Sequence, residues 1–318
     1  MTLARRHFLA ATAALAAAAP LHAQDKTVRF ILPNATGSGV DAITRTVQPA
    51  LAKALGHPIV VDNQPGAGGI VGLQALARSA PDGLTLSVVS NNVVIFPSVL
   101  KSIPFVMPDD FTPIAVVGYT PVVLVVNAKV PAANARELAA LLKQKNGEMN
   151  YASGGNGTIL HLAAEMYLDA AGVKARHIPY KGVGPMITDL IGGQVEFATA
   201  ALPSVQQHLR SGALRAIGVA TAQRVAAAPE IPTFVEQGVD YQVEAWFAVV
   251  GPKGLPAAEV QRVHGAVTAA FADPAVKDAM ARQGNVIAVQ PADKAMAFFR
   301  SEMQRFAQLV KKAGVEPQ

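Results

Sequence analysis

The stretch Asn150–Gly182, NYASGGNGTILHLAAEMYLDAAGVKARHIPYKG, contains the pattern around which the rest of the chain is organised. It begins with a short strand, followed by a glycine-rich turn at 153–158. Apolar residues at helical spacing predict a helix from Ile159, which Gly172 is placed to end. A second strand is predicted at 176–179. The order of strand, glycine-rich turn, helix and strand indicates an α/β unit.

The glycine-rich turn of this unit is a candidate anion site. A helix that starts directly after such a turn points free backbone N–H groups at a bound anion. Glycine lets a ligand approach the backbone closely, and Ser153, Asn156 and Thr158 add hydroxyl and amide groups. The functional interpretation is a pocket for a carboxylate or a similar anion. The alternative interpretation is an ordinary tight turn between a strand and a helix.

The first 23 residues are typical of an export signal. Arg5 and Arg6 precede an apolar, alanine-dominated run, and the sequence around Ala23 predicts cleavage after that residue. The segment Arg5-Arg6-His7-Phe8-Leu9 also resembles the twin-arginine pattern of proteins that are exported already folded. We therefore expect a protein of the periplasm.

Charge and composition exclude several classes of protein. Removing residues 1–23 deletes two arginines and no acidic residue, so the formal net charge falls from +5 to +3. This mildly basic chain has no run of Lys and Arg that could follow a nucleic-acid backbone. No later apolar segment is long enough to span a bilayer. The chain has no cysteine, which excludes disulfides, thiolate chemistry and a lipid-anchored cysteine.

Before the central stretch, the sequence predicts a β-α-β-α-β series. Its predicted strands are 28–32, 58–61 and 84–89. The two helices follow glycine-rich turns at 34–39 and 65–69, and Ser38 and Asp41 have the spacing of a capping box. Such a series forms a doubly wound sheet with right-handed crossovers.

The pattern restarts in the second half of the chain. A proline-rich, irregular region is predicted at 96–113, followed by two separate strands at 115–117 and 122–126. A second β-α set, which includes the central stretch, continues with strands at 194–198 and 214–220. The C-terminal helices have no independent sheet, so we expect them to pack on the first domain.

These elements predict an α/β protein with two lobes, each a doubly wound sheet flanked by helices. After removal of the signal, roughly 295 residues are enough for two domains of typical size. We predict a discontinuous domain 1 at 24–124 and 245–318 and a domain 2 at 125–244, with two strands crossing between them. This arrangement places a cleft between the lobes, and each lobe offers helix N-termini to it.

One motif favours a different function. Gly37-x-Gly39-x-x-Ala42 follows a strand and opens a helix, and Asp62 ends the next strand about twenty residues on, as in a dinucleotide-binding fingerprint. The alternative function is therefore an exported NAD(P)-binding oxidoreductase. Against it, Pro33 directly precedes the turn, Asp62 runs straight into another glycine loop, and no hydride-transfer constellation is evident.

Catalytic and metal-binding motifs are absent from the sequence. There is no Gly-x-Ser-x-Gly elbow, HExxH or phosphate loop. Ser153 and His161 have no acidic residue placed to orient the histidine, and the histidines lack ligand-like spacing. His161 is better interpreted as a support for the turn. Lys181 is a charge for an anion or a solvated rim residue, and Trp246 and Phe247 are core residues more often than cleft wall.

The chain resembles the tripartite tricarboxylate transporter family of periplasmic solute-binding proteins, also called Bug proteins. The resemblance covers essentially all of the sequence after the export signal. It rests on VVDNQPGAGG at 60–69, APDG at 80–83, NYAS at 150–153 with GNGT at 155–158 and His161-Leu162, PYKG at 179–182, and LPS at 202–204.

This resemblance implies a binding protein of the type II Venus-flytrap fold, which closes about a hinge and has no catalytic activity, cofactor or metal. A small carboxylate is held between the first β-α loop and the central glycine loop, largely by backbone amides and bridging waters. The predicted ligand-binding residues are Thr36, Gly37, Ser38, Gly39, Asp41, Asn91, Ser153, Asn156, Gly157, Thr158, His161, Tyr180, Thr199 and Ala200. The expected partners are the permease subunits of a tripartite transporter or a sensor protein, and we expect a monomer with no nucleic-acid partner.

Two departures from the family pattern bear on the ligand. The first loop, 34–41, lacks the usual Pro-Gly-Gly-rich run. Where many members have an aspartate before the Leu-Pro-Ser element, this chain has Ala200 and Ala201. If that aspartate contacts a ligand ammonium group, its absence disfavours an amino acid. We therefore predict a dicarboxylate or an aromatic carboxylate without an amine.

Overall fold

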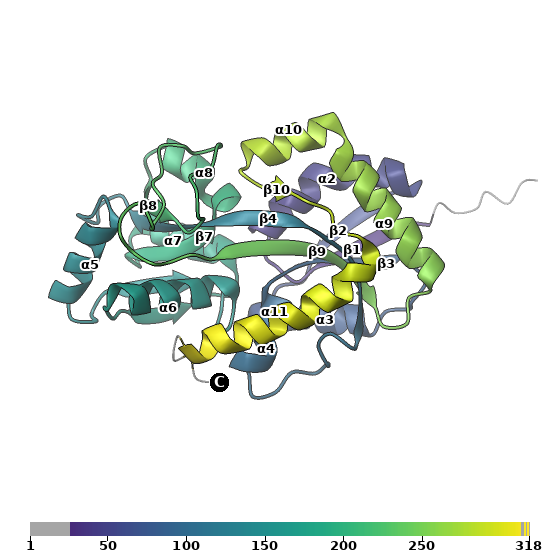
Figure 1. Cartoon of the computed structure of the whole chain (residues 1–318), viewed down its shortest axis with the longest axis horizontal. Coiled ribbons are helices and arrows are strands. Elements are labelled where there is room, and N and C mark those ends of the chain that lie inside the picture. The colour runs from purple at the N-terminus through teal and green to yellow at the C-terminus, as the bar shows by residue number, and fades with distance from the viewer. Residues whose placement is uncertain (1–25, 313–314, 316, 318) are drawn as a thin grey trace, which may run out of the picture.

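Figure 1 shows the computed structural model of the chain, which describes residues 26–312, 315 and 317. The predicted export signal at 1–23 lies outside the described residues. The strands are β1 (Val28–Leu32), β2 (Ile59–Asn63), β3 (Thr85–Ser90), β4 (Phe111–Asn127), β5 (Asn150–Ser153), β6 (Arg176–Pro179), β7 (Phe197–Ala201), β8 (Leu214–Val219), β9 (Glu244–Pro252) and β10 (Val286–Ile287). The helices are α2 (Gly39–Leu55), η1 (Ala67–Gly69), α3 (Ile70–Ala77), α4 (Asn92–Val99), α5 (Ala135–Gln144), α6 (Ile159–Ala171), α7 (Val183–Gly192), α8 (Leu202–Arg210), α9 (Ala257–Ala272), α10 (Pro274–Arg282) and α11 (Ala292–Lys312).

The first lobe is built on a parallel sheet in the order β2-β1-β3. β9 joins this sheet antiparallel to β3 and pairs along its other edge with β4. Helices α2, α9 and α10 share one apolar cluster with β1, in which Phe30, Ile43, Val47, Val263 and Met280 are buried. The C-terminal helices α9 and α10 therefore pack on the first lobe, as the sequence predicted (Figure 1).

The second lobe has the parallel order β6-β5-β7, and β4 connects it to the first. Pro121 of β4 pairs with Glu244 of β9, whereas the next residue, Val122, pairs with Ala201 of β7. One strand therefore belongs to both lobes and passes from one sheet to the other at 121–122. Figure 1 shows β4 and β9 running side by side between the lobes. The protein thus has the predicted two-lobed α/β fold.

The prediction of two separate strands at 115–117 and 122–126 was wrong, because β4 is continuous from Phe111 to Asn127. Gly118 suggested a turn, but it serves a different purpose. A Cβ atom at Gly118 would lie 2.1 Å from the carbonyl oxygen of Val286. Glycine is required there because β10 approaches the backbone of β4 closely, which is a recognised role of glycine inside a strand.

Two other boundaries differ from those predicted. Helix α4 extends to Val99, into the region predicted to be irregular, and residues 93–96 are all buried. Because α4 is apolar on every side, it has no amphipathic period to reveal it. Strand β7 begins at Phe197, three residues later than predicted. The backbone N–H of Gln194 instead bonds to the carbonyl of Asp189 and completes the end of α7.

A buried polar network supports the central glycine-rich loop from behind. The hydroxyl of Ser153 lies 2.7 Å from Nε2 of His177 and accepts the N–H of Gly155 at 3.2 Å. The ring of His177 stacks on that of His161, with centroids 4.0 Å apart and planes inclined by 7°. His161 Nδ1 accepts the backbone N–H of Gly157 at 3.2 Å. Both histidines therefore position the loop, as the sequence predicted for His161.

Burial keeps both rings uncharged. Desolvation lowers the pKa of His161 to about 4, and desolvation together with the neighbouring His161 lowers the pKa of His177 to about 3. Tyr151 stacks on His177 and donates its hydroxyl to Glu165, whose own pKa is raised by burial. A proton on Nδ1 of His161 would face the N–H of Gly157, so protonation is incompatible with this arrangement.

We predict that acid destabilises the protein through these two histidines. The unfolded chain binds protons on them near pH 6.5, whereas the folded chain does so only near pH 4 and 3, so the free energy of unfolding decreases as pH falls below about 6.5. The double variant His161→Asn, His177→Gln, which keeps polar atoms in place, should have a flatter dependence. Chemical denaturation between pH 4 and 7 measures it.

The control for this experiment is His208→Gln on α8, outside the network. It removes one histidine and should keep the wild-type slope. Because Oε1 of Glu165 lies 3.8 Å from Nε2 of His161, the double variant reports on the histidines together with their contact to this carboxyl. A double variant with the wild-type pH dependence would contradict the assignment.

Candidate ligand-binding site

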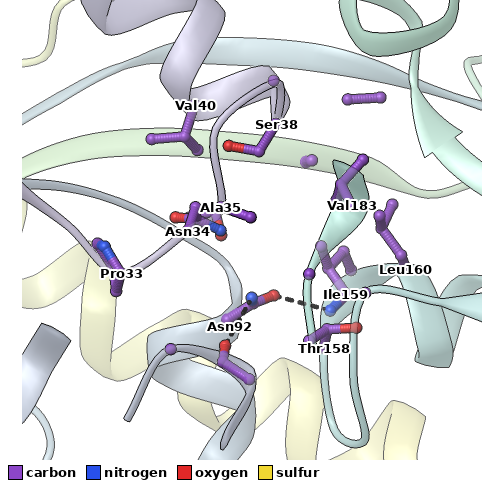
Figure 2. Close-up of a pocket in the computed structure, with 18 of the residues that line it drawn as sticks. Pro33, Asn34, Ala35, Ser38, Val40, Asn92, Thr158, Ile159, Leu160 and Val183 are labelled. Carbon is purple, nitrogen blue, oxygen red and sulfur yellow. Dashed lines mark hydrogen bonds between the residues drawn. The ribbon is translucent and has the colours of Figure 1, made fainter. Parts of the chain in front are cut away.

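A cavity lies between the lobes, where strands of both sheets end. Figure 2 shows Asn34, Ser38 and Val40 of the first lobe facing Thr158 and Leu160 of the second across it. The space that a water-sized sphere can reach inside is about 70 Å³. A water molecule needs roughly 10–15 Å³ on this scale, so the cavity has room for a few waters or a small ligand.

The helices α2, α3, α4, α6, α7 and α8 all begin at this cavity. In each of them either the N-cap or the first helical residue lines it: Ser38, Gly69, Asn92, Thr158, Gly182 and Ala201. The cause is topological, because each helix follows a parallel strand whose carboxyl end faces the cleft. A helix start leaves up to four backbone N–H groups without intrahelical partners and has a partial positive charge of about one half. The site therefore favours an anion.

Charged side chains add little to this field. Among the described residues that line the cavity, Lys181 alone has an ionisable side chain, and it is exposed. Asp41 is buried nearby, but its carboxylate accepts the N–H of Gly37 at 3.0 Å, Nε of Arg45 at 2.9 Å and Nδ2 of Asn63 at 3.0 Å. These bonds satisfy it, so Asp41 holds the first loop in place.

Three side chains contribute buried polar atoms with no hydrogen-bond partner. They are Oδ1 of Asn34, Oγ1 of Thr120 and Oγ of Ser204, and all three residues line the cavity. Leaving a buried hydroxyl unpaired costs about 1–3 kcal/mol. Unpaired polar atoms that converge on one cavity are typical of a binding site prepared for a polar ligand.

Of the residues predicted from the sequence, Ser38, Gly39 and Thr158 line the cavity. Ser38 and Thr158 also cap α2 and α6, because their hydroxyls accept the N–H groups of Asp41 and His161. The structure therefore brings the starts of the first loop and of the central loop together across the cleft. Both roles follow from one geometry, since an N-cap side chain lies at the helix end that faces the ligand.

The other predicted residues lie behind or beside the cavity. Ser153, Asn156, Gly157 and His161 belong to the central loop and its support, and Thr36, Gly37 and Asp41 to the first loop and its support. Thr199 donates its hydroxyl to the carbonyl of Leu160, and Ala200 is buried in the second lobe's core. Tyr180 donates to Asp189 at 2.7 Å, and Asn91 bonds the backbone of β9 at Trp246 and Glu244.

Polar lining residues that were not named as ligand contacts from the sequence include Asn34, which lies in the predicted first loop, and Asn92, Thr120 and Ser204. Ser204 belongs to the Leu-Pro-Ser element, and Asn34 and Asn92 are polar residues that lie two positions after the ends of buried strands β1 and β3. That position was the available signal for both asparagines. No sequence signal marked Thr120 as a lining residue, because its segment was predicted to interrupt the strand. Trp246 and Phe247 are buried and also line the cavity, so they belong to the core and to the cleft wall together.

The two lobes touch each other directly around the cavity. Oδ1 of Asn92 accepts the N–H of Ile159 at 2.8 Å across the cleft (Figure 2). A Cβ atom at Gly39 would lie 2.8 Å from Cβ of Ala201, and one at Gly182 would lie 2.6 Å from Cβ of Ala35. Contacts this short require glycine on one side. The structure therefore represents a closed arrangement of the lobes.

The geometry does not favour a dinucleotide. In a dinucleotide-binding protein the acid at the end of the second strand is available to a ribose. Here the carboxylate of Asp62 bonds the guanidinium of Arg29 and accepts Nε2 of Gln64 at 2.9 Å. The Arg29 hydrogen bond is the main reason that the pKa of Asp62 is lowered. Asp62 does not line the cavity.

Two further searches concern the described part of the chain only. Within residues 26–312, 315 and 317, no three His, Asp or Glu side chains are grouped so that they could hold a metal ion. The same residues contain no helix that is both long enough and apolar enough to cross a membrane.

Comparisons of the sequence and of the structure with known proteins identify the same family. Residues 43–315 match the family model described as "Tripartite tricarboxylate transporter family receptor". Protein BugT of Bordetella pertussis is 34% identical over 305 residues, which is 94% of each chain. The structure of the periplasmic binding protein BugD superposes with a TM-score of 0.88 and 30% identity, over 92% of this chain and 99% of BugD.

A third relative contains a ligand. The structure of Rpa4515 of R. palustris with adipate superposes with a TM-score of 0.88 and 26% identity, over 92% of this chain and 98% of that protein. The relatives are named as binding proteins, and the matching family consists of receptors rather than enzymes. The chain therefore belongs to the tripartite tricarboxylate transporter receptor family, the periplasmic solute-binding proteins that include the Bug proteins.

Proposed function

We propose that this protein captures a small dicarboxylate in the interlobe cavity and presents it, in the closed form, to the permease subunits of a tripartite transporter or to a sensor protein. The observation that carries the proposal is the convergence of helix N-termini on a cavity without an acidic side chain among its described lining residues. Charge-assisted bonds from backbone N–H groups to a carboxylate are strong and need no cationic side chain. The adipate bound to Rpa4515 supports this ligand class.

The proposed contacts combine predicted residues with new ones. Ser38, Gly39 and Thr158 would meet the ligand together with Asn34, Thr120 and Ser204, whose polar atoms have no partner in the closed protein. A ligand with an ammonium group would find no carboxylate among the described lining residues. This composition supports a carboxylate without an amine, in agreement with the alanines at 200–201.

The proposed mechanism is a shift between open and closed populations. Contacts from both lobes to one ligand stabilise the closed form over the open form. The division into 24–124 with 245–318 and 125–244 stays a proposal, and the change of sheets at 121–122 supports a hinge near its boundary. Cleavage near Ala23, a monomeric state and delivery to a transporter belong to the same proposal.

A thermal-shift screen tests the ligand class. The protein lacking residues 1–23 would be heated with C4 to C8 dicarboxylates, tricarboxylates, aromatic carboxylates, amino acids and NAD(P). A ligand at a hundred times its dissociation constant stabilises the folded protein by about 2.7 kcal/mol, so a dicarboxylate should raise the Tm measurably. A shift with NAD(P) or amino acids alone would contradict the proposal.

We predict that Ser204→Ala weakens dicarboxylate binding without destabilising the fold. The hydroxyl has no partner in the protein, so its removal should change the free energy of unfolding by less than about 0.5 kcal/mol. Loss of a charge-assisted bond should weaken the affinity about tenfold. Calorimetric titration measures the affinity, and Ser301→Ala, on an exposed face of α11, is the control. If Ser204→Ala binds the dicarboxylate with unchanged affinity, the ligand does not contact Ser204 and the proposed site is wrong.

We also predict that Gly39→Ala impairs closure. Gly39 begins α2 with ordinary helical geometry, so alanine suits its backbone, but the new methyl group would meet Ala201 of the other lobe. Overpacking costs about 1–3 kcal/mol, which corresponds to an affinity for the ligand that is weaker by about 5-fold to 150-fold.

The matched control is Gly265→Ala on α9, where an added Cβ has no atom within 4 Å. Both substitutions replace a helical glycine by a better helix former, so both should keep or raise the stability. The closure account fails if Gly39→Ala binds like wild type, or if Gly265→Ala loses the same affinity.

A further inference from the structure

A second, larger cavity lies beside the shared strand β4, and we call it the hinge groove. It is lined by Tyr119–Pro121 of β4, Glu244 of β9, the loop 221–227 of the second lobe, and Ala281 and 284–286 of the first lobe. The space that a water-sized sphere can reach is about 460 Å³. In Figure 1, α8 of the second lobe and α10 of the first lobe both lie above β4.

The walls of the hinge groove come from different lobes that touch at one end. Nε2 of Gln206 on α8 donates to the carbonyl of Arg282 at the end of α10, at 3.0 Å. A Cβ atom at Gly284 would lie 2.9 Å from Cγ1 of Val225 and 3.0 Å from Cδ2 of Leu202. The shape of the groove therefore depends on how the lobes are arranged.

Two buried side chains bring unpartnered polar atoms to this groove. Asn285 is 7% exposed, and its Nδ2 bonds Oε1 of Gln283 at 3.0 Å while its Oδ1 has no partner. Thr120 is 6% exposed, and its Oγ1 has no partner either. Thr120 lines both the hinge groove and the interlobe cavity. An amide oxygen only accepts hydrogen bonds, so Asn285 requires a donor.

One of the two charged side chains that line the groove has an ion-pair partner and the other has none among the described residues. The guanidinium of Arg224 is paired with Glu236, because its Nε donates to both carboxylate oxygens at 3.0 and 2.9 Å. Its Nη1 donates to the carbonyl of Pro229. Glu244 is exposed at the groove and has no ion pair among the described residues. Burial is the main reason that the pKa of Tyr119 is raised, and the negative charges of Glu302 and Glu244 add to it. The groove therefore presents one unmatched carboxylate and one unmatched acceptor.

We propose that the hinge groove binds a small alkylammonium ion. Glu244 and Oδ1 of Asn285 accept its N–H groups, and its alkyl chain lies against the apolar side chains of Val225, Ala281 and Val286. An ammonium group supplies three donors and a positive charge, which are what the groove lacks. Because both lobes form the walls, a bound amine also stabilises this arrangement of the lobes. The proposal does not depend on which ligand occupies the interlobe cavity.

Calorimetric titration of the protein lacking residues 1–23 with n-butylammonium tests the proposal. We expect saturable binding of n-butylammonium and none of butan-1-ol, which has the same alkyl chain without the charge. Glu244→Gln should weaken the binding about fivefold, as for removal of one partly exposed ion pair. The control Glu148→Gln removes an exposed carboxylate that lines neither cavity and should bind like wild type.

Backbone amide NMR locates the site in the same titration. The signals of Gly284 and Asn285 should shift with the saturation of the amine. The proposal is overturned if n-butylammonium does not bind, if butan-1-ol binds equally well, or if Glu148→Gln weakens binding as much as Glu244→Gln. Shifts confined to residues outside the groove would also overturn it.

Discussion

The proposed site depends on the backbone N–H groups at the beginnings of the helices, which have no carbonyl partner within their own helix. In a β-α unit these groups appear at the carboxyl end of the strand, and here the units of both lobes direct that end to one cleft. Several partial positive charges therefore accumulate where almost no side chain is charged. Such a field suits an anion, because it is fixed by the fold and needs no buried ion pair.

Closure is built into the same elements. The starts of α2 and α8 meet through Gly39 and Ala201, so any larger residue at either helix start would hold the lobes apart. Asn92 bonds an N–H of α6 from the opposite lobe and adds a directional contact. Because β4 belongs to both sheets, a change at 121–122 would move one set of helix N-termini relative to the other. The proposed ligand binding and the proposed lobe movement thus depend on one arrangement.

Much of the fold could be predicted because its signals are local. Glycine-rich turns after apolar strands marked the β-α units, and Gly172 ends α6 in the left-handed conformation that glycine favours. The continuity of β4 could not be predicted, since the need for Gly118 arises from β10, which lies far along the chain. The same limit applies to the site. Ser38 was evident as a helix cap and Thr158 as a hydroxyl of the glycine-rich turn, whereas Thr120 contributes only because two lobes meet over it.

The most direct test of the account compares two ligands of the same shape. Calorimetric titration of the protein with butanedioate and with butanediamide varies the charge of the ligand while its length stays constant. If the convergent helix N-termini make the site, the dianion binds and the neutral diamide binds far more weakly or not at all. Equal affinity for the two compounds would contradict an anion site built from backbone N–H groups.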